Sequence, residues 1–386
     1  MTDPRRRDAI AELVAQVRPP SGADPLDIQR RLDSLTKPLG SLGRLEEVAL
    51  RLARISGLPP KVLEHRVVFV LAGDHGVTAR GVSAYPSEVT VQMCRNIAAG
   101  GAAISVLARQ ARCDVVVADM GVAGARLGAG VLDVRVRAGT ADLASEPAML
   151  EEEAAEALLV GARLVALQRP RPDVVCLGEM GIGNSTAAAA LTALLTGCNP
   201  GEAVGAGTGV TGSALIAKTA AVRAAVDRVG PGAAPLEALR QVGGLEIAGL
   251  VGVVLRAAAQ GVPVILDGFI ATAAAMVAVR LTPHAKDYLF ASHRSVEPGH
   301  GVLLQALGLE PLLVLGLRLG EGTGAVLALP LLDGAVAILR EMATFAGADV
   351  SGPREAASLV TTREAAYIHI TRSEDAPAEA SLLEAP

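Results

Sequence analysis

Hydrophobic residues gather in five short runs, each of which closes in a turn rich in glycine or polar residues. The runs are 67–76 (VVFVLAGDHG), 113–124 (CDVVVADMGVAG), 173–184 (DVVCLGEMGIGN), 262–269 (VPVILDGF) and 312–324 (LLVLGLRLGEGTG). Continuous apolar runs bounded by turns are typical of strands that are buried on both faces, as in a parallel sheet. The pattern therefore predicts a framework of buried parallel strands.

Stretches with apolar residues at helical spacing separate these runs. In one of them, Ser145 and Pro147 predict the first turn of a helix whose apolar face includes Leu158 and which ends before Pro170. Another helix is expected to begin after Pro330. The alternation predicts an α/β fold, with a mostly parallel, Rossmann-like sheet and helices on both faces. Ligands of such sheets bind beyond the carboxyl ends of the strands, where the glycine-rich turns would meet.

The two ends of the chain differ from its middle. Residues 1–60 are predicted to be helical, and so is the segment 341–370. Together these segments would form a small helical subdomain, while residues 61–340 would form the α/β catalytic domain. The polar tail 371–386 is expected to be disordered.

Composition and charge exclude several classes of protein. Hydrophobic residues make up 51% of the chain but aromatic residues only 2%, so the core must consist mainly of Ala, Val and Leu. The net charge is −5 with acids and bases mixed, unlike the basic face of a nucleic-acid-binding protein. The N-terminus lacks a signal-type apolar segment, and the longest uncharged stretch, 180–201, is too polar to span a membrane. Four scattered cysteines indicate free thiols in a reducing compartment, and hence a soluble, cytoplasmic protein: Cys94, Cys113, Cys176 and Cys198.

Two glycine-rich segments are candidates for binding an anion. GEMGIGNST (178–186) follows a predicted strand and opens a helix that Asn184 or Ser185 would cap, and free N–H groups at a helix start attract phosphate. A tight turn without a ligand is the equally favoured alternative. GAGTGVTG (205–212) contains GxGxxG, but NPGEAV precedes it instead of the strand that a dinucleotide-binding fold requires. Lys218 in the next helix would bind a phosphate or carboxylate, or else lie on the surface.

Three further segments carry polar residues at predicted strand ends or turns. GDHGV (73–77) lacks accompanying metal ligands, so Asp74 and His75 are expected to form hydrogen bonds within their own turn. SHRSVEPGH (292–300) holds two serines and two histidines, and without a third ligand at suitable spacing we expect no metal site there. Asp267 ends a strand beside a glycine, where it would bind ribose hydroxyls or cap the next helix.

Glu321 lies between two glycines in LGLRLGEGTGA (315–325), a segment that offers its carboxylate almost no partner. In an apolar turn a carboxylate loses solvation and its pKa rises, and a Glu tuned in this way is an effective general base. The alternative is an acidic residue that interacts favourably with the dipole of the following helix. This segment alone favours the alternative.

Seven segments, taken together and in this order, resemble one enzyme family. They are KPLGSLGRLE, AGDHGV, SAYPSEVTVQM, GEMGIGNST, LDGF, SHRS and RLGEGTGA. The chain resembles the nicotinate-nucleotide:dimethylbenzimidazole phosphoribosyltransferases, which make α-ribazole phosphate for the lower ligand of cobalamin. The resemblance runs from about residue 20 to about residue 350. Ser185 stands where a Thr is expected, a change that keeps the hydroxyl.

The resemblance implies transfer of the phosphoribosyl group of nicotinate mononucleotide to 5,6-dimethylbenzimidazole. The pyridinium leaves without an acid, whereas the benzimidazole must lose a proton as its ring nitrogen bonds to the anomeric carbon. One base is enough, and neither a metal nor another cofactor is implied. A single displacement would invert the sugar from β to α, as in sugar transfers that form no covalent enzyme intermediate.

By resemblance, Glu321 is that base, and Glu179 is the rival candidate. Met180, Tyr85 and Leu319 would line an apolar slot for the bicyclic ring. The resemblance assigns the nucleotide to a set of glycines and polar side chains: Gly181, Gly183, Gly207, Lys218, Asp267, Ser292 and Ser295. It also implies a homodimer that acts on these two small molecules, and nothing in the sequence suggests a nucleic-acid or membrane partner.

Two other functions fit parts of the sequence. An NAD-dependent dehydrogenase would use GTGVTG, but that motif lacks a preceding strand and an acidic partner in a matching βαβ unit. A non-catalytic homologue that binds nucleotide and senses cobamide supply would not need the carboxylate of RLGEGTG. The phosphoribosyltransferase is therefore the predicted function.

Overall fold

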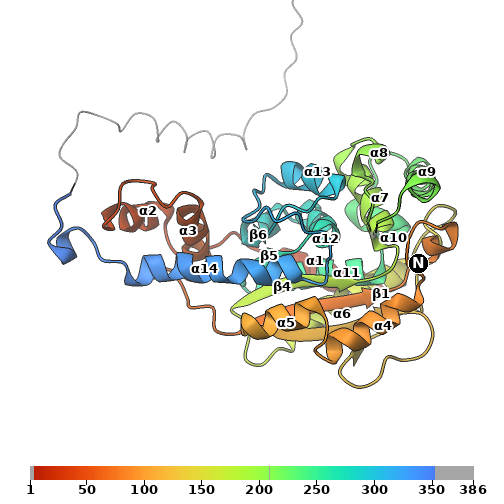
Figure 1. Ribbon diagram of the computed structural model, residues 1–386, viewed down its shortest axis with the longest axis horizontal. Coiled ribbons are helices and arrows are strands. Elements are labelled where there is room, and N and C mark those ends of the chain that lie inside the picture. Colours follow the sequence, from red (N-terminus) through yellow and green to blue (C-terminus); the bar gives the residue numbers. More distant parts are fainter. Residues whose placement is uncertain (1–3, 208, 353–386) are drawn as a thin grey trace, which may run out of the picture.

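The computed structural model describes residues 4–207 and 209–352 of the 386-residue chain. Its centre is a six-stranded sheet with the order β3-β2-β1-β4-β5-β6, and all neighbouring strands are parallel (Figure 1). The strands are β1 (Arg66–Gly73), β2 (Asp114–Gly121), β3 (Leu132–Asp133), β4 (Val174–Met180), β5 (Val264–Leu266) and β6 (Leu289–Ala291). This order is that of the Rossmann fold. The predicted parallel α/β sheet is confirmed.

The central strand is buried on both faces, as its unbroken apolar sequence predicts. Seven of the eight residues of β1 are buried. Phe69 and Leu71 contribute to one hydrophobic core, whereas Val68 and Val70 contribute to a second core on the opposite face. Alternate residues of a strand point to opposite faces, so a strand between two cores must be apolar at every position.

Helices cover both faces of the sheet. The first core includes α6 (Glu151–Ala166), α11 (Leu245–Ala259) and α12 (Phe269–Leu281), and the second includes α3 (Arg44–Ser56), α5 (Ala103–Gln110) and α14 (Thr323–Glu341). The other helices are α1 (Pro4–Gln16), α2 (Pro25–Ser34), α4 (Glu88–Ala98), α7 (Asn184–Thr196), α8 (Pro200–Ala203), α9 (Gly212–Val229), α10 (Pro235–Val242) and α13 (Pro298–Leu307). Short 3-10 helices span Gly76–Arg80, Pro283–Tyr288 and Ala346–Ala348.

Three predicted elements need correction. The run 312–324 is not a strand: its first part lies beside the segment after β6, where the Arg294 N–H donates to the Leu313 carbonyl (2.8 Å), and its last residues begin α14. The helix expected after Pro330 starts at Thr323 and continues through that proline. The helix expected from Ser145 starts at Glu151, where the Glu153 side chain accepts a hydrogen bond from the Leu150 N–H. In addition, β3 and β6 were not predicted from the sequence.

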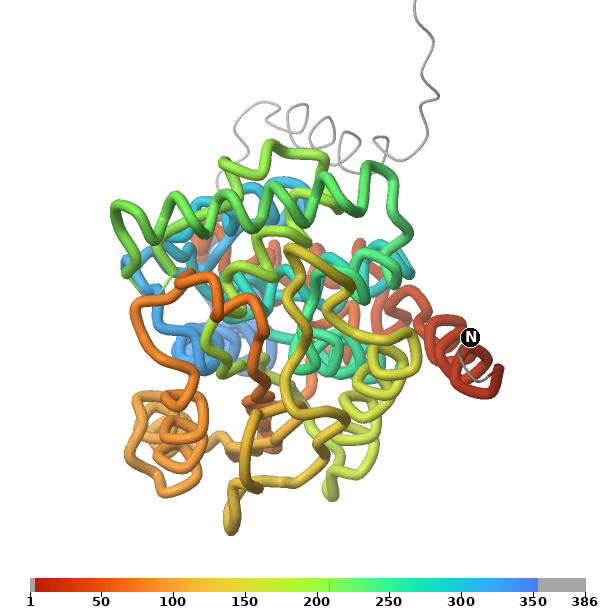
Figure 2. The backbone as a smooth tube through the Cα atoms, turned by 90° about the vertical axis from the view of Figure 1, so that its right-hand side faces the viewer, coloured from red at the N-terminus to blue at the C-terminus, as the bar shows by residue number. Residues whose placement is uncertain are grey.

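Within the described residues, the helices near the two ends of the chain pack on different parts of the molecule. Helices α2 and α3 pack on each other, α3 packs on α14, and Leu35 forms an antiparallel bridge with Thr344. By contrast, α1 packs on α6 and α11 of the sheet region, and it stands at one side of the molecule in Figure 2. Residues 342–352 contain only a short 3-10 helix instead of the expected longer one. The segment 353–370 and the tail 371–386 lie outside the described residues, and the domain boundaries stay a prediction.

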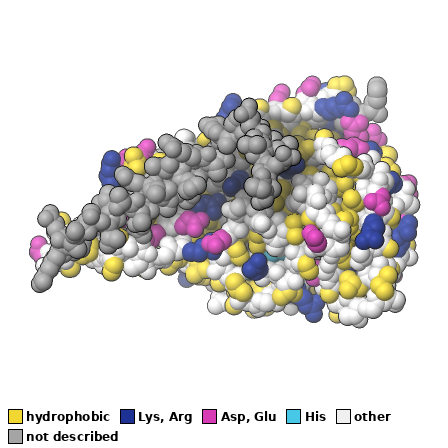
Figure 3. Space-filling view, turned by 90° about the horizontal axis from the view of Figure 1, so that it is seen from above, with side chains coloured by type: hydrophobic (Ala, Val, Ile, Leu, Met, Phe, Trp, Pro, Cys, Tyr) yellow, Lys and Arg dark blue, Asp and Glu magenta, His cyan; other side chains and the backbone are white. Residues whose placement is uncertain are grey.

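Helix α14 is the single helix within residues 4–207 and 209–352 that is long and apolar enough to cross a membrane. That test uses length and composition only, and 56% of the apolar window is buried inside the fold, where α14 packs on α3, α5, β4 and β5. Its apolar character therefore has an explanation in the core. On the face shown in Figure 3, acidic and basic side chains are interspersed among neutral and apolar ones.

Candidate active site

The strand order reverses between β1 and β4, which makes this position a topological switch point of the sheet. From β1 it proceeds to β2 on one side, and from β4 it proceeds to β5 on the other, so the turns after β1 and β4 diverge at their shared edge. The two strands end in register, with Ala72 opposite Met180. In parallel sheets the crevice at such a switch point is the usual ligand site. The glycine-rich turns 73–77 and 178–186 both open here.

Glu321 carries its carboxyl group to this edge from the turn before α14. The residue is 4% exposed, and its Oε2 atom has no hydrogen-bond partner among the residues that the structure describes. Burial raises the pKa of the Glu321 carboxyl above its ordinary value, and the backbone N–H of Ile104 opposes this shift. The predicted loss of solvation is therefore present. A carboxyl group of this kind can accept a proton from a bound heterocycle.

A strained turn fixes the position of Glu321. Glu321 has φ +64°, and the flanking Gly320 and Gly322 have φ +86° and +92°, a region that few residues other than glycine adopt. The backbone of Glu321 packs directly on β4, because a Cβ added to Gly178 would lie 2.5 Å from the Glu321 carbonyl oxygen. A Cβ added to Gly320 would clash with the Glu179 carboxyl. The turn thus brings the two predicted carboxyl groups to one place.

Asp267, at the end of β5, anchors the same turn. Its carboxyl group accepts hydrogen bonds from the backbone N–H groups of Gly322 (3.0 Å), Gly324 (2.7 Å) and Ala325 (3.2 Å). Asp267 was expected either to bind ribose hydroxyls or to cap the next helix. Both of its oxygens cap a helix, but that helix is α14 and not the next one in the chain. Burial raises the pKa of Asp267 to about 7, while these three donors favour its ionised form.

Glu179 lies on β4 beside the Glu321 turn. It is 6% exposed and accepts a hydrogen bond from the Asn184 amide at the start of α7. Burial, and then the nearby Asp267, Glu246 and Glu321 carboxyls, raises its pKa to about 8, although the Asn184 hydrogen bond opposes the shift. Asn184 therefore binds Glu179 and does not cap α7, whose N-cap residue is Gly183. At neutral pH the Glu179 carboxyl is mostly protonated.

Lys218 lies beside the second glycine-rich segment. Its ammonium group is buried and donates hydrogen bonds to Ser185 Oγ (3.0 Å) and the Gly205 carbonyl (2.9 Å). A Cβ at Gly207 would lie 2.8 Å from Lys218 Nζ, so only a glycine fits beside the cation without a clash. Burial lowers the pKa of Lys218 to about 8, although the nearby Glu297 carboxylate acts to raise it. Lys218 is thus no surface lysine.

The segment 292–300 is a hydrogen-bonded core structure. Ser292 is fully buried and its Oγ lies 3.1 Å from His293 Nδ1, while the Ser295 N–H donates to His300 Nδ1 (3.0 Å). Since that nitrogen is an acceptor, His300 Nε2 carries the proton and donates to Thr272 Oγ1 (3.0 Å). Burial lowers the pKa of His293 to about 4 and that of His300 to about 3, so both are neutral. Among the described residues, no group of three or more His, Cys, Asp or Glu could hold a metal ion.

The three residues of the expected apolar slot are not enclosed within one copy of the chain. Met180 is half-buried and packs against the second core, but Tyr85 is 54% exposed and Leu319 is 57% exposed. A slot with two open walls needs a further surface to exclude water. The slot therefore stays a prediction.

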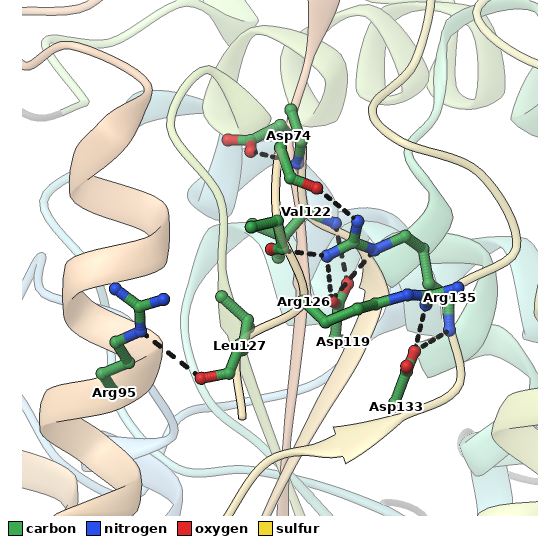
Figure 4. A network of polar contacts seen from close by, with 11 residues as sticks. Asp74, Arg95, Asp119, Val122, Arg126, Leu127, Asp133 and Arg135 are labelled. Atoms are coloured by element: carbon green, nitrogen blue, oxygen red, sulfur yellow. Dashed lines mark hydrogen bonds and ion pairs between the residues drawn. The ribbon is translucent and has the colours of Figure 1, made fainter. Parts of the chain in front are cut away.

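Asp74 and His75 form their side-chain hydrogen bonds outside their own turn, contrary to expectation. His75 Nε2 lies 2.7 Å from Glu246 Oε1 in α11, and Asp74 Oδ2 accepts from the Ala123 N–H (2.8 Å). Figure 4 shows Asp74 beside the loop after β2. Arg135, which follows β3, binds the Asp119 carboxylate of β2 through two nitrogens (3.0 and 2.6 Å) and the Gly124 carbonyl of that loop (2.7 Å).

Sequence reasoning missed Glu246 and Glu297, which lie beside the site. Glu297 accepts a hydrogen bond from the Gly207 N–H (2.8 Å), and so fixes the second glycine-rich loop. Glu246 appears in the sequence as an ordinary acidic residue in the first turn of a helix. No local signal distinguishes it, because its partner His75 is 171 residues away. The GxGxxG motif follows α8 and not a strand, so it has no dinucleotide-binding context.

Comparison with known proteins assigns the family. A family model described as "Phosphoribosyltransferase" matches residues 17–350. A Desulforamulus reducens protein named nicotinate-nucleotide–dimethylbenzimidazole phosphoribosyltransferase is 50% identical over 346 residues, which cover 89% of this chain and 99% of that protein. The chain belongs to this phosphoribosyltransferase family. A Thermus thermophilus member of the same name is 52% identical over 325 residues, covering 83% of this chain and 96% of its own.

A solved structure of this phosphoribosyltransferase family has the same fold. The crystal structure of the enzyme from Thermus thermophilus matches with a TM-score of 0.81 and 49% identity, over 85% of this chain and 98% of that one. The resemblance found in the sequence motifs is confirmed. The family match begins at residue 17, directly after α1.

Proposed function

We propose that this chain transfers the phosphoribosyl group of nicotinate mononucleotide to 5,6-dimethylbenzimidazole, and so forms α-ribazole 5'-phosphate and nicotinate for cobalamin synthesis. Family membership and the named relatives support this pair of substrates. The observation that carries the proposal is the Glu321 carboxyl, which is buried, unpaired at Oε2 and raised in pKa at the ligand edge of the sheet. Neither a nucleotide sensor nor a dehydrogenase requires such a base.

The reaction needs one base. A ring nitrogen of the benzimidazole bonds to the anomeric carbon, the bond from that carbon to the nicotinate nitrogen breaks, and its electron pair neutralises the pyridinium. The benzimidazole N–H proton passes to Glu321, which is the base in this proposal. Attack from the face opposite the leaving group inverts the sugar from β to α. Glu179, mostly protonated at neutral pH, does not compete for the proton.

Residues around Lys218 would bind the donor nucleotide. Lys218 and Ser185 supply a cation and a hydroxyl group, and the glycines of the β4–α7 turn allow the phosphate to approach backbone N–H groups. Gly207 is the glycine next to both side chains. The side chains of Asp267 and Ser292 form hydrogen bonds within the protein, to the start of α14 and to His293.

The proposal includes a cytoplasmic homodimer. Val314, Leu315 and Leu319 are 76%, 58% and 57% exposed, and they lie on the segment that leads into the Glu321 turn. A second copy that covers this segment would also complete the slot that Tyr85 and Leu319 leave open. Four free cysteines suit a reducing compartment. Light scattering on the purified protein should give twice the mass of the chain.

The test is an assay of the purified protein with nicotinate mononucleotide and dimethylbenzimidazole. We expect equal amounts of nicotinate and of a phosphoribosylated benzimidazole, whose anomeric configuration is determined by NMR. A β-linked product would overturn the single displacement. No nicotinate release with dimethylbenzimidazole or a panel of related bases would overturn the function.

A further inference from the structure

A buried ion pair lies directly behind the turns that form the site. His75 follows β1 and Glu246 lies in the first turn of α11, and neither side chain is exposed to solvent. Their Nε2 and Oε1 atoms are 2.7 Å apart. Burial by itself lowers the pKa of His75, but the Glu246 carboxylate and then Asp74 raise it above its ordinary value. The two side chains therefore hold each other through a short, fully buried contact.

The pair contacts the β4–α7 turn across the gap between β1 and β4. A Cβ at Gly181 would lie 3.4 Å from Glu246 Oε1, and a Cβ at Gly183 would lie 3.3 Å from the His75 Cβ. On the β1 side, a Cβ at Gly73 would lie 2.6 Å from Glu246 Oε2. Both diverging turns at the switch point thus rest on the same two side chains.

The pair is not arranged for stability alone. His75 Nδ1 and Glu246 Oε2 are buried without a hydrogen-bond partner among the residues in the described ranges. Buried polar atoms usually have partners, and a buried ion pair gains little net stability, because desolvation offsets the attraction. A pair with unsatisfied atoms at the ligand edge is better explained by the geometry that it imposes on its neighbours.

We propose that His75 and Glu246 are positioning residues, whose paired side chains set the geometry of the Gly181–Gly183 turn for binding of the phosphoribosyl donor. This inference rests on the proposed function. The pair acts on the donor side of the reaction, since it contacts the turn that would approach the phosphate and not the Glu321 turn. Its loss should therefore affect the nucleotide more than the benzimidazole.

The charged groups that face the pair also determine its pH response. They are Asp74 on the turn after β1 and Glu179 on β4, in addition to the two partners themselves. The negative charge of Glu246 is one of the causes that raise the pKa of Glu179. Neutralising Glu246 should consequently lower the pH at which Glu179 ionises.

The experiment compares Glu246→Gln, His75→Gln and the double variant with the wild type in steady-state kinetics. We expect each single variant to raise KM for nicotinate mononucleotide about tenfold, with KM for dimethylbenzimidazole changed less than twofold. Glu246→Gln should also shift the alkaline limb of the kcat/KM profile to lower pH. If the pair acts as a unit, the double variant should lose no more than either single one.

Asp173→Asn is the matched control. Asp173 is a buried carboxylate at the opposite edge of the same sheet, where it accepts hydrogen bonds from the Glu64 and His65 N–H groups (3.0 and 2.8 Å). The Asp173→Asn substitution should lower thermal stability and leave both KM values unchanged. Should a single variant not fold, the double variant carries the test, because it leaves no uncompensated buried charge.

An unchanged KM for the nucleotide and an unchanged pH profile would overturn the inference. Equal increases of both KM values, or a response that matches Asp173→Asn, would also overturn it. The wild-type assay in the same series tests the function separately, since loss of turnover there would refute the reaction and not the role of the pair.

Discussion

At the scale of single residues, the proposed reaction depends on the protonation of two neighbouring carboxyl groups. Burial raises the pKa of the Glu321 carboxyl, whereas burial and three further acids raise the pKa of Glu179 to about 8. Two similar side chains thus receive different roles from their environments. The difference is measurable in each case.

We expect Glu321→Gln to reduce kcat by at least about 100-fold, the lower range for loss of a general base. The amide has the same shape, so the thermal midpoint should change little. Glu310→Gln is the control, because the Glu310 side chain is 75% exposed, and its rate should equal that of the wild type. A Glu321→Gln variant with wild-type turnover would assign the proton to Glu179 or to solvent.

We expect Glu179→Gln to flatten the pH dependence of stability. The pKa of Glu179 is about 8 in the folded protein against an ordinary value of 4.5, so the native state binds the proton more tightly than the unfolded state. The contribution of this bound proton to the free energy of unfolding is therefore complete below pH 4.5. It is lost as the pH rises to about 8, by up to about 1.4 kcal/mol per pH unit. Urea unfolding at pH 6 and pH 9 should show a smaller difference for the variant than for the wild type. An equal difference would contradict the buried, protonated state.

At the scale of elements, α14 connects the site to the core. Its N-terminus is capped by Asp267 from β5, and the preceding turn lies on β4 at Gly178. The helix is buried along most of one side, so its position is set by the second core. Any displacement of its start moves Glu321 directly.

Two glycine-to-alanine substitutions distinguish the contact between Gly178 and the Glu321 turn from a general effect of adding a methyl group to a glycine. Gly178→Ala should reduce kcat more than tenfold, because the new Cβ would lie 2.5 Å from the Glu321 carbonyl and displace the turn. Gly334→Ala, in the middle of α14, meets no atom within 4 Å and should leave kcat unchanged. The second variant should gain about 0.5–1 kcal/mol of stability in a helix interior. Equal kinetics for both variants would show that the β4 contact does not position Glu321.

At the scale of the whole molecule, segments near both ends of the described chain bind each other. The Ser34 carbonyl accepts from the Phe345 N–H (3.0 Å), and Arg31 donates to the carbonyls of Leu339 (3.3 Å) and Met342 (2.9 Å) at the end of α14. Basic side chains commonly satisfy the last carbonyls of a helix in this way. We expect α2, α3 and α14 to unfold together with the sheet.

Two adjacent arginines test this cooperativity. Arg31→Met should cost about 1–3 kcal/mol, since it removes two charged hydrogen bonds. Arg30→Met should change stability by less than about 0.5 kcal/mol, because its ion pair with Asp27 is largely exposed. Calorimetry should show one transition for each protein. A separate low-temperature transition in Arg31→Met would mean that the α2–α3 unit unfolds by itself.

Local pattern by itself determined the buried strands and the motifs. β1, β2, β4 and β5 are recognisable because residues buried on both faces must be apolar without interruption. Glu321 is recognisable because a charged residue between glycines has no local partner. The same reasoning failed at 312–324, where an apolar run lies beside the segment after β6 instead of joining the sheet as a strand.

Only the tertiary structure decided which distant groups meet. His75 pairs with Glu246, and Asp267 on β5 caps a helix that begins far along the chain, at Thr323. Neither contact leaves a periodicity or a motif in the sequence. The physical reason is that parallel strands bring all their carboxyl ends to one edge, so side chains from separate segments become neighbours there. Their burial, and hence their protonation, is a property of that assembled edge and not of any segment.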